Sequence, residues 1–161
     1  MGTSMMKAIT YSEFGISTDV LKLKELPIPK AGKGEVQVSL QFSGSNPSDA
    51  KSRAGNRPGV IKPQFEQIVP NSDGSGVITA VGEGVQESRI GQRVWIWNGQ
   101  WQRPYGTAAE YITVPSTQAV EMPEDMSFET GACLGIPGLT ASYCTLGDGE
   151  LNEKTVFVSG G

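Results

Sequence analysis

The sequence predicts a mainly β domain with short helices, of the α+β class, and three observations support this. Glycine and proline are frequent, with 21 and 10 of the 161 residues, and such residues favour short strands joined by turns over a helical bundle. Several runs alternate between apolar and polar residues, as half-buried strands do. The separators between these runs carry turn-forming residues. We therefore expect a small barrel or sandwich, followed by a shorter helical part.

The alternating runs define the expected strands. In the clearest of them, Val36, Val38 and Leu40 lie on one face, because successive side chains of a strand point to opposite sides. Turn residues separate this run from its neighbours, for example Lys33-Gly34 before it. The expected strands cover residues 6–11, 21–26, 35–42, 76–81, 93–97 and 108–114.

The glycines of Gly74-Ser75-Gly76 resemble those of a phosphate-binding loop, but we assign them to the strands. The alternating run 77–81 follows them, whereas a helix follows a phosphate-binding loop. Glycine within a strand permits the close approach of a neighbouring backbone. These glycines, with Gly82 and Gly84 after the run, are therefore expected to serve turns and strand packing.

A short helix is predicted over residues 47–53, where the alternation stops. Asn46 is placed to cap its N-terminus, and Pro47 takes the first helical position, where the missing N–H group has no partner to lose.

Residues 127–146 are apolar at helical spacing, and Gly135-Ile136-Pro137-Gly138 interrupts them. Because proline breaks a helix interior, two consecutive helices are expected. Ser127 is placed to cap the first, and Gly147 is placed to end the second.

The last residues form a short apolar run, Thr155–Val158, that leads to Ser159-Gly160-Gly161. A buried parallel strand followed by glycines opens a dinucleotide-binding βαβ unit. The same residues also fit a C-terminal edge strand with a flexible tail. These residues by themselves leave both interpretations open.

The composition excludes several kinds of function. A net charge of −4 without a basic cluster argues against nucleic acid and anionic membranes as partners. The absence of histidine removes Ser-His and Cys-His nucleophile pairs and, with only two cysteines, leaves no plausible zinc site. Cys133 and Cys144 are expected to be buried small hydrophobic residues in a reducing compartment. Since no export signal or membrane span is evident, we expect a cytoplasmic protein.

Eight motifs follow one another along the chain, namely Met6-Lys7-Ala8-Ile9, Gly34-Glu35-Val36-Gln37-Val38, Ser45-Asn46-Pro47-Ser48-Asp49, Asp73-Gly74-Ser75-Gly76-Val77-Ile78, Val81-Gly82-Glu83-Gly84-Val85, Gly91-Gln92-Arg93-Val94, Gly106-Thr107-Ala108-Ala109-Glu110-Tyr111 and Gly135-Ile136-Pro137-Gly138-Leu139-Thr140-Ala141. In this order they resemble the medium-chain dehydrogenase/reductase superfamily, in particular its zinc-independent quinone oxidoreductase (zeta-crystallin-like) branch. Zinc-dependent alcohol dehydrogenases of the superfamily carry a cysteine ligand where this chain reads Gly44-Ser45-Asn46-Pro47, and a four-cysteine lobe that this chain lacks.

This resemblance implies a domain organisation. Residues 1–5 look like an expression remnant, residues 6–126 would form a GroES-like, partly open β-barrel catalytic domain, and residues 127–154 a helical connector. Residues 155–161 would then be the first strand of a truncated, NADPH-binding Rossmann domain, with Gly160 and Gly161 at the pyrophosphate.

The resemblance also implies the principal site residues. Asn46 matches an asparagine beside the nicotinamide and the substrate, and we expect it to serve both catalysis and cofactor binding; the alternative is that it only caps the following helix. Thr140 matches a threonine whose hydroxyl approaches the nicotinamide ring. The alternative for Thr140 is a helix threonine that bonds to a carbonyl one turn back.

Further candidates lie around the expected substrate. Lys51 stands where several quinone reductases have tyrosine and is a candidate donor to the oxyanion, with a solvated surface charge as the alternative. Trp95 and Trp97 are assigned to the barrel core. Trp101 and Tyr105 fit either the core or the rim of a substrate cleft.

The sequence therefore predicts a zinc-independent reductase that transfers hydride from NADPH to a quinone or an α,β-unsaturated carbonyl, a homo-oligomer in its full-length form. This chain would be its catalytic half and inactive alone. The alternative is a stand-alone GroES-like module that binds or oligomerises without catalysis.

Overall fold

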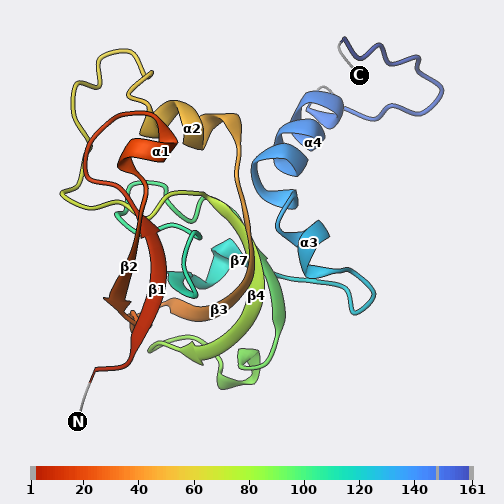
Figure 1. Ribbon diagram of the computed structural model, residues 1–161. Helices are drawn as coiled ribbons and strands as arrows, with labels where there is room; N and C mark the ends of the chain where they lie inside the picture. Colours follow the sequence, from red (N-terminus) through yellow and green to blue (C-terminus); the bar gives the residue numbers. More distant parts are fainter. Residues whose placement is uncertain (1–2, 148, 160–161) are drawn as a thin grey trace.

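The computed structural model describes residues 3–147 and 149–159 and consists mainly of antiparallel β-sheet (Figure 1). A two-stranded sheet pairs β1 with β2, and a five-stranded sheet has the order β6-β3-β4-β5-β7. The strands are β1 (Met5–Thr10), β2 (Lys22–Pro27), β3 (Glu35–Gly44), β4 (Asp73–Val81), β5 (Arg93–Ile96), β6 (Tyr111–Pro115) and β7 (Ala119–Glu121). The predicted mainly β fold is confirmed, including the six strands expected from the alternating runs, while β7 was not predicted.

The helical segments are short. They are α1 (Ser17–Val20), α2 (Pro47–Arg53), α3 (Phe128–Gly131), α4 (Leu139–Leu146), the 3₁₀ turns Glu87–Arg89 and Ser116–Gln118, and a π-helical turn at Leu134–Gly138. The prediction of α2 is confirmed, with Asn46 at its N-cap and Pro47 at the first helical position.

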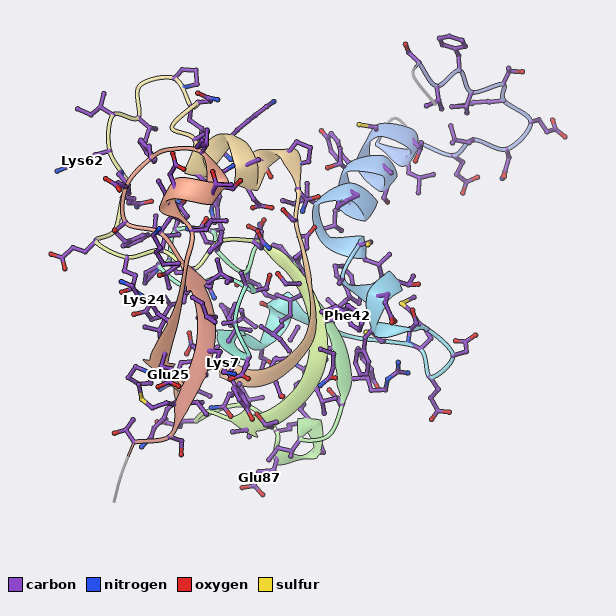
Figure 2. The ribbon with its side chains drawn as sticks, in the orientation of Figure 1. Lys7, Lys24, Glu25, Phe42, Lys62 and Glu87 are labelled. Atoms are coloured by element: carbon purple, nitrogen blue, oxygen red, sulfur yellow. The ribbon has the colours of Figure 1, made fainter. Side chains whose placement is uncertain are left out.

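The main core lies on one face of the five-stranded sheet. Alternate residues of the strands point into it, because a strand exposes its side chains with a period of two. Its buried members are Val36, Val38, Ile78, Val94, Ile96, Ile112, Val114 and Ala119. The predicted inward face of β3 is therefore confirmed. Charged side chains such as Lys24, Lys62 and Glu87 lie at the outer surface (Figure 2).

The two sheets touch but do not close into a barrel. The amide of Ile9 in β1 donates to the carbonyl of Ala108 at 2.8 Å, and Ala8 forms an isolated bridge with Ala109. These contacts join the first sheet to the segment that precedes β6. The sheets otherwise remain open, so the predicted partly open barrel takes the form of two open sheets.

The glycines of β4 serve strand packing, as predicted. A Cβ atom at Gly76 would lie 2.1 Å from the carbonyl oxygen of Ser39, so only glycine lets β3 and β4 pair this closely. No nucleotide-binding turn is involved, because Gly74 and Gly76 lie inside the strand.

The prediction that Trp95 and Trp97 belong to the core is wrong. Val94 and Ile96 are fully buried on the core side of β5, so Trp95 points to the opposite face and is only partly buried. Trp97 lies beyond the end of the strand, and its indole N–H donates to the carbonyl of Thr117 at 3.3 Å.

An arginine anchors the start of the connector. The Arg93 guanidinium donates to the carbonyl oxygens of Glu124 at 2.6 Å and of Met126, and lies 4.6 Å from the centre of the Phe128 ring. The Ser127 hydroxyl accepts a hydrogen bond from the Thr130 amide at 3.2 Å and so caps α3 as predicted. Gly147 ends α4, also as predicted.

Both cysteines are exposed, so the prediction that they are buried is wrong. Cys144 lies on α4, which extends beyond the sheets (Figure 1). The apolar side chains of this helix are exposed too: 46% for Leu139, 79% for Tyr143 and 56% for Leu146. Helical spacing predicted apolar positions here, but no described residue covers them.

Residues 155–158 form no strand, in contrast to the prediction for residues 155–161. A strand needs a neighbouring strand for its backbone hydrogen bonds, and these residues pair with none within the described chain. Val156, Phe157 and Val158 are accordingly exposed. Gly160 and Gly161 lie outside the described residues, and the division into domains stays a prediction. No helix among the described residues is both long and apolar enough to cross a membrane.

Candidate functional site

Asn46 occupies a buried position where β3 leads into α2. Its exposed fraction is 9%. Its backbone N–H donates to Asp49 Oδ2 at 2.8 Å, which satisfies one of the amides at the start of the helix. Its side-chain nitrogen Nδ2 donates to Asp73 Oδ2, also at 2.8 Å. Asn46 therefore caps α2 through its backbone and its side chain in a capping box, and the same side chain donates to a second carboxyl group.

Asp73 is the first residue of β4 and is almost fully buried, with an exposed fraction of 1%. The register of the sheet pairs it with Gly44, which places its side chain beside the end of β3. Asp73 Oδ2 also accepts a hydrogen bond from the backbone amide of Ile136 at 2.8 Å. One carboxyl oxygen thus joins Asn46 to the π-helical turn before α4.

The hydrogen bond to Asp73 fixes the orientation of the Asn46 amide. An ionised carboxylate only accepts hydrogen bonds, so the NH₂ group of Asn46 must face Asp73. The Asn46 Oδ1 atom then points away from Asp73. This oxygen is the acceptor of the side chain and faces the backbone amide of Asp49 in the capping box of α2, and an amide oxygen has a second lone pair that can accept another hydrogen bond.

Burial makes both carboxyl groups weaker acids than usual. It raises the pKa of Asp73, and the hydrogen bonds from the Ile136 amide and the Asn46 side chain act in the opposite direction. Burial also raises the pKa of Asp49; the hydrogen bond from the Asn46 backbone opposes this, and the charge of Asp73 adds to the rise. The site has a low local polarity, in which hydrogen bonds are strengthened.

Thr140 lies in the first turn of α4, one turn after Ile136, and is exposed. Within the described residues, its hydroxyl does not bond to the carbonyl one turn back, whereas Thr145 donates to the carbonyl of Ala141 at 2.7 Å. The alternative of a backbone-bonded helix threonine therefore does not hold for Thr140. Its hydroxyl is available to a ligand.

Lys51 lies on α2 and is exposed. The structure therefore agrees with a solvated charge, and no described residue holds the ammonium group toward Asn46.

Trp101 and Tyr105 belong to different cavities. Trp101 is 59% exposed and lines a cavity of about 320 Å³ together with Tyr11, Phe14 and Arg57. Tyr105 is 39% exposed and lines a separate cavity of about 290 Å³. Asn46 lines neither of them, so the structure does not bring the two aromatic residues together with the amide.

The contacts of Asp73 were not predicted from the sequence, in which Asp73 belongs only to a glycine-rich motif. The available signal was an acidic residue at the first position of a buried strand, since carboxylates are rarely buried without a partner. That partner, Asn46, is far away in sequence and was visible only after folding.

Asn46 and Thr140 offer neutral hydrogen-bonding groups, an amide and a hydroxyl. No cluster of three or more metal-binding side chains (histidine, cysteine, aspartate or glutamate) occurs in residues 3–147 and 149–159.

Known proteins resemble the chain over most of its length. It is 35% identical over 147 residues to the synaptic vesicle membrane protein VAT-1 homolog of Rattus norvegicus. The aligned region covers 89% of this chain and 33% of that protein. It is 33% identical over 141 residues to the quinone oxidoreductase of Lama guanicoe, covering 87% of this chain and 40% of that protein. The solved structure of mycobacterial Rv1454c complexed with NADPH matches with a TM-score of 0.72 and 29% identity, over 86% of this chain and 39% of that one.

The chain thus spans a third to two-fifths of the length of these relatives. Residues 32–124 match the alcohol dehydrogenase GroES-like domain. Because this match covers more than half of the chain, and because the fold and the relatives agree with it, the chain belongs to the GroES-like domain family of the medium-chain dehydrogenase/reductase superfamily.

Proposed function

We propose that this chain is the catalytic half of a zinc-independent oxidoreductase that transfers hydride from NADPH to a quinone or an α,β-unsaturated carbonyl. The observation that carries the proposal is the buried, oriented amide of Asn46, tied through Asp73 to the turn that precedes Thr140. The quinone oxidoreductase relative and the NADPH complex of a structural neighbour support the choice of reaction and cofactor.

The nicotinamide end of the cofactor would lie against Asn46 and Thr140. NADPH supplies the hydride when it is bound. Asn46 Oδ1 would accept a hydrogen bond from the cofactor, and the Thr140 hydroxyl would approach the ring from α4. These contacts orient the reacting group, and orientation is a major source of rate enhancement.

The remaining site residues have subsidiary roles in this proposal. Lys51 is a candidate donor to the developing oxyanion, although its exposure weakens that contribution. Trp101 offers a flat apolar wall for a quinone, since it lines a cavity of about 320 Å³. Tyr105, which lines a separate cavity of about 290 Å³, is a further candidate substrate contact.

Catalysis would also need a nucleotide-binding domain that holds the pyrophosphate, where we place Gly160 and Gly161. We further propose that the complete enzyme is cytoplasmic and forms homo-oligomers. The name of the VAT-1 relative refers to the synaptic vesicle membrane, and this location is stated for that protein alone.

A second candidate is a stand-alone binding or oligomerising module. The exposed apolar side chains of α4, namely Leu139, Tyr143 and Leu146, favour it, because such a surface suits a partner.

NADPH oxidation distinguishes the two candidates. It should be measured in a protein in which this chain is followed by its nucleotide-binding domain, with benzoquinone and with an enone as acceptors. Acceptor-dependent oxidation that Asn46→Ala reduces would support the enzyme. Absence of oxidation with both acceptors, in a protein that binds NADPH, would refute it in favour of the module.

A further inference from the structure

We propose that Asp73 is the positioning residue of this site. Its buried carboxylate orients the Asn46 amide and, through the same oxygen, holds the connector that carries Thr140. The inference rests on the proposed function, because it assigns to Asp73 the placement of the two groups that would contact the nicotinamide.

Asn46 and the connector share one oxygen atom of Asp73. Asp73 Oδ2 accepts from Asn46 Nδ2 and from the Ile136 amide, each at 2.8 Å. Hydrogen bonds to an ionised group are shorter and stronger than neutral ones. A single atom therefore sets both the rotation of the asparagine side chain and the position of the turn before α4.

The backbone of the connector approaches this carboxyl group closely. Gly135 lies directly against Asp73, where any side chain would collide with the carboxyl group. A Cβ atom at Gly44 would lie 2.2 Å from the carbonyl oxygen of Ala132. Glycines on both sides thus let the connector reach Asp73. The turn itself is π-helical, a form that is frequent at functional sites.

The burial of the Asp73 carboxyl group lowers the stability of the folded protein. Within the described residues, the second carboxyl oxygen, Asp73 Oδ1, is buried without a hydrogen-bond partner. Burying an unsatisfied polar atom typically destabilises a protein by about 1–3 kcal/mol. A residue that served only the fold would avoid this penalty. The unsatisfied oxygen is explained if the carboxylate is retained to position Asn46 and the connector.

Asp49 provides a matched control, because it binds the same asparagine in a different way. Asp49 Oδ2 accepts from the backbone amide of Asn46, whereas Asp73 Oδ2 accepts from its side chain. A change at Asp49 disturbs the start of α2, where the Asn46 side chain also contacts this carboxyl group, but it leaves the bond from Asn46 Nδ2 to Asp73 Oδ2. A change at Asp73 removes that bond.

A double-mutant cycle of Asp73 and Asn46 tests the catalytic part in the protein that includes the nucleotide-binding domain. Asp73→Ala should lower kcat about tenfold or more, and Asp73→Asn, which keeps the shape and a neutral acceptor, should lower it less. In the Asn46→Ala background, Asp73→Ala should lower kcat by a smaller factor than in wild type, because only its contribution through the connector and Thr140 remains. Asp49→Asn should lower kcat by a smaller factor than Asp73→Asn, because the bond from Asn46 Nδ2 to Asp73 is retained. Effects of Asp73→Ala that multiply independently of Asn46 would overturn the proposal.

An NMR experiment on the 161-residue chain keeps the test independent of the reaction. The side-chain NH₂ protons of Asn46 should exchange slowly and resonate apart from those of exposed amides. Asp73→Ala should abolish both properties and shift the backbone amide of Thr140, and Asp49→Asn should preserve them. If Asp73→Ala does not fold, Asp73→Asn is used instead. In that variant the Asn46 NH₂ resonances should move closer to those of exposed amides. Unchanged Asn46 resonances in a folded Asp73 variant would overturn the positioning role. A positive NMR result without NADPH oxidation would instead refute the proposed function alone.

Discussion

Gly135 lies so close to Asp73 that a Cβ atom at Gly135 would be 2.1 Å from Asp73 Oδ1 and 2.5 Å from its carboxyl carbon. Gly135 therefore determines how near the connector comes to the sheet. The contact joins two segments that are far apart in sequence, and both of them contribute to the candidate site.

Gly135→Ala should destabilise the protein by about 1–3 kcal/mol, because the new methyl group must displace a buried carboxyl group. Chemical denaturation measures this directly. Gly138→Ala is the control, since its Cβ atom would meet Leu134 at an ordinary 3.6 Å, and alanine in a helical turn should be neutral or stabilising. Equal losses for the two variants would contradict our account of the contact.

Asn46→Ala and Thr140→Val should lower the rate of NADPH-dependent quinone reduction by about tenfold or more, because both residues are proposed to contact the nicotinamide. The loss should appear in kcat or in cofactor affinity. The melting temperature should change little for the exposed Thr140 and should fall for Asn46→Ala, which removes the cap of α2 and a partner of the buried Asp73 carboxylate. Lys51→Met is the comparison and should have a smaller effect, since Lys51 is exposed. If Asn46→Ala left the rate unchanged while Lys51→Met abolished it, the assignment of the main role to Asn46 and of the minor role to Lys51 would be wrong.

Stability should depend on pH through the buried carboxyl groups. Burial raises the pKa of Asp49 and of Asp73 above the ordinary value of 3.8. The folded state therefore binds protons more tightly than the unfolded state, and these groups stabilise the fold most when protonated. Their contribution to the free energy of unfolding is lost as the pH rises from 3.8 through the raised pKa values.

Asp49→Asn should remove part of this dependence. Unfolding of both proteins at about pH 4 and at about pH 7 should show the variant gaining stability relative to wild type at the higher pH. Ionisable groups that both proteins contain contribute equally to the two free energies of unfolding, so their titration cancels in the difference. A relative stability that moves the other way would show that the Asp49 pKa is lowered by folding.

The 161-residue chain alone should neither bind NADPH appreciably nor transfer hydride. It contributes only the nicotinamide end of the proposed site, and the exposed apolar side chains of α4 favour self-association. Calorimetric titration with NADPH, together with chromatographic size, checks both statements. Micromolar binding by a monomer would show that the cofactor site is complete in these residues.

The purified protein should contain no stoichiometric zinc. The chain has no histidine and only two cysteines, which leaves no plausible set of four nitrogen or sulfur ligands. Elemental analysis after treatment with a chelator provides the measurement. Retained zinc at one equivalent would contradict this prediction and the proposed zinc-independent branch together.

Local patterns predicted the regular elements well. The alternation that placed Val36 and Val38 inward needed only the period of a strand, and Pro47 marked the start of α2 by its fixed backbone angle. The same reasoning failed for Trp95, because size and apolarity do not say which face of a strand is covered. That choice depended on Val94 and Ile96 packing in the core.

The sequence by itself determined the mainly β fold, the helix after Asn46 and the break before α4, because turn chemistry, periodicity and proline geometry act over a few residues. Only the tertiary structure decided that Asn46 faces Asp73 and that Ile136 shares the same oxygen. These partners lie 27 and 63 residues from Asp73 along the chain. Their meeting depends on the pairing of β3 with β4 and on the glycines that let the connector approach, which no local pattern encodes.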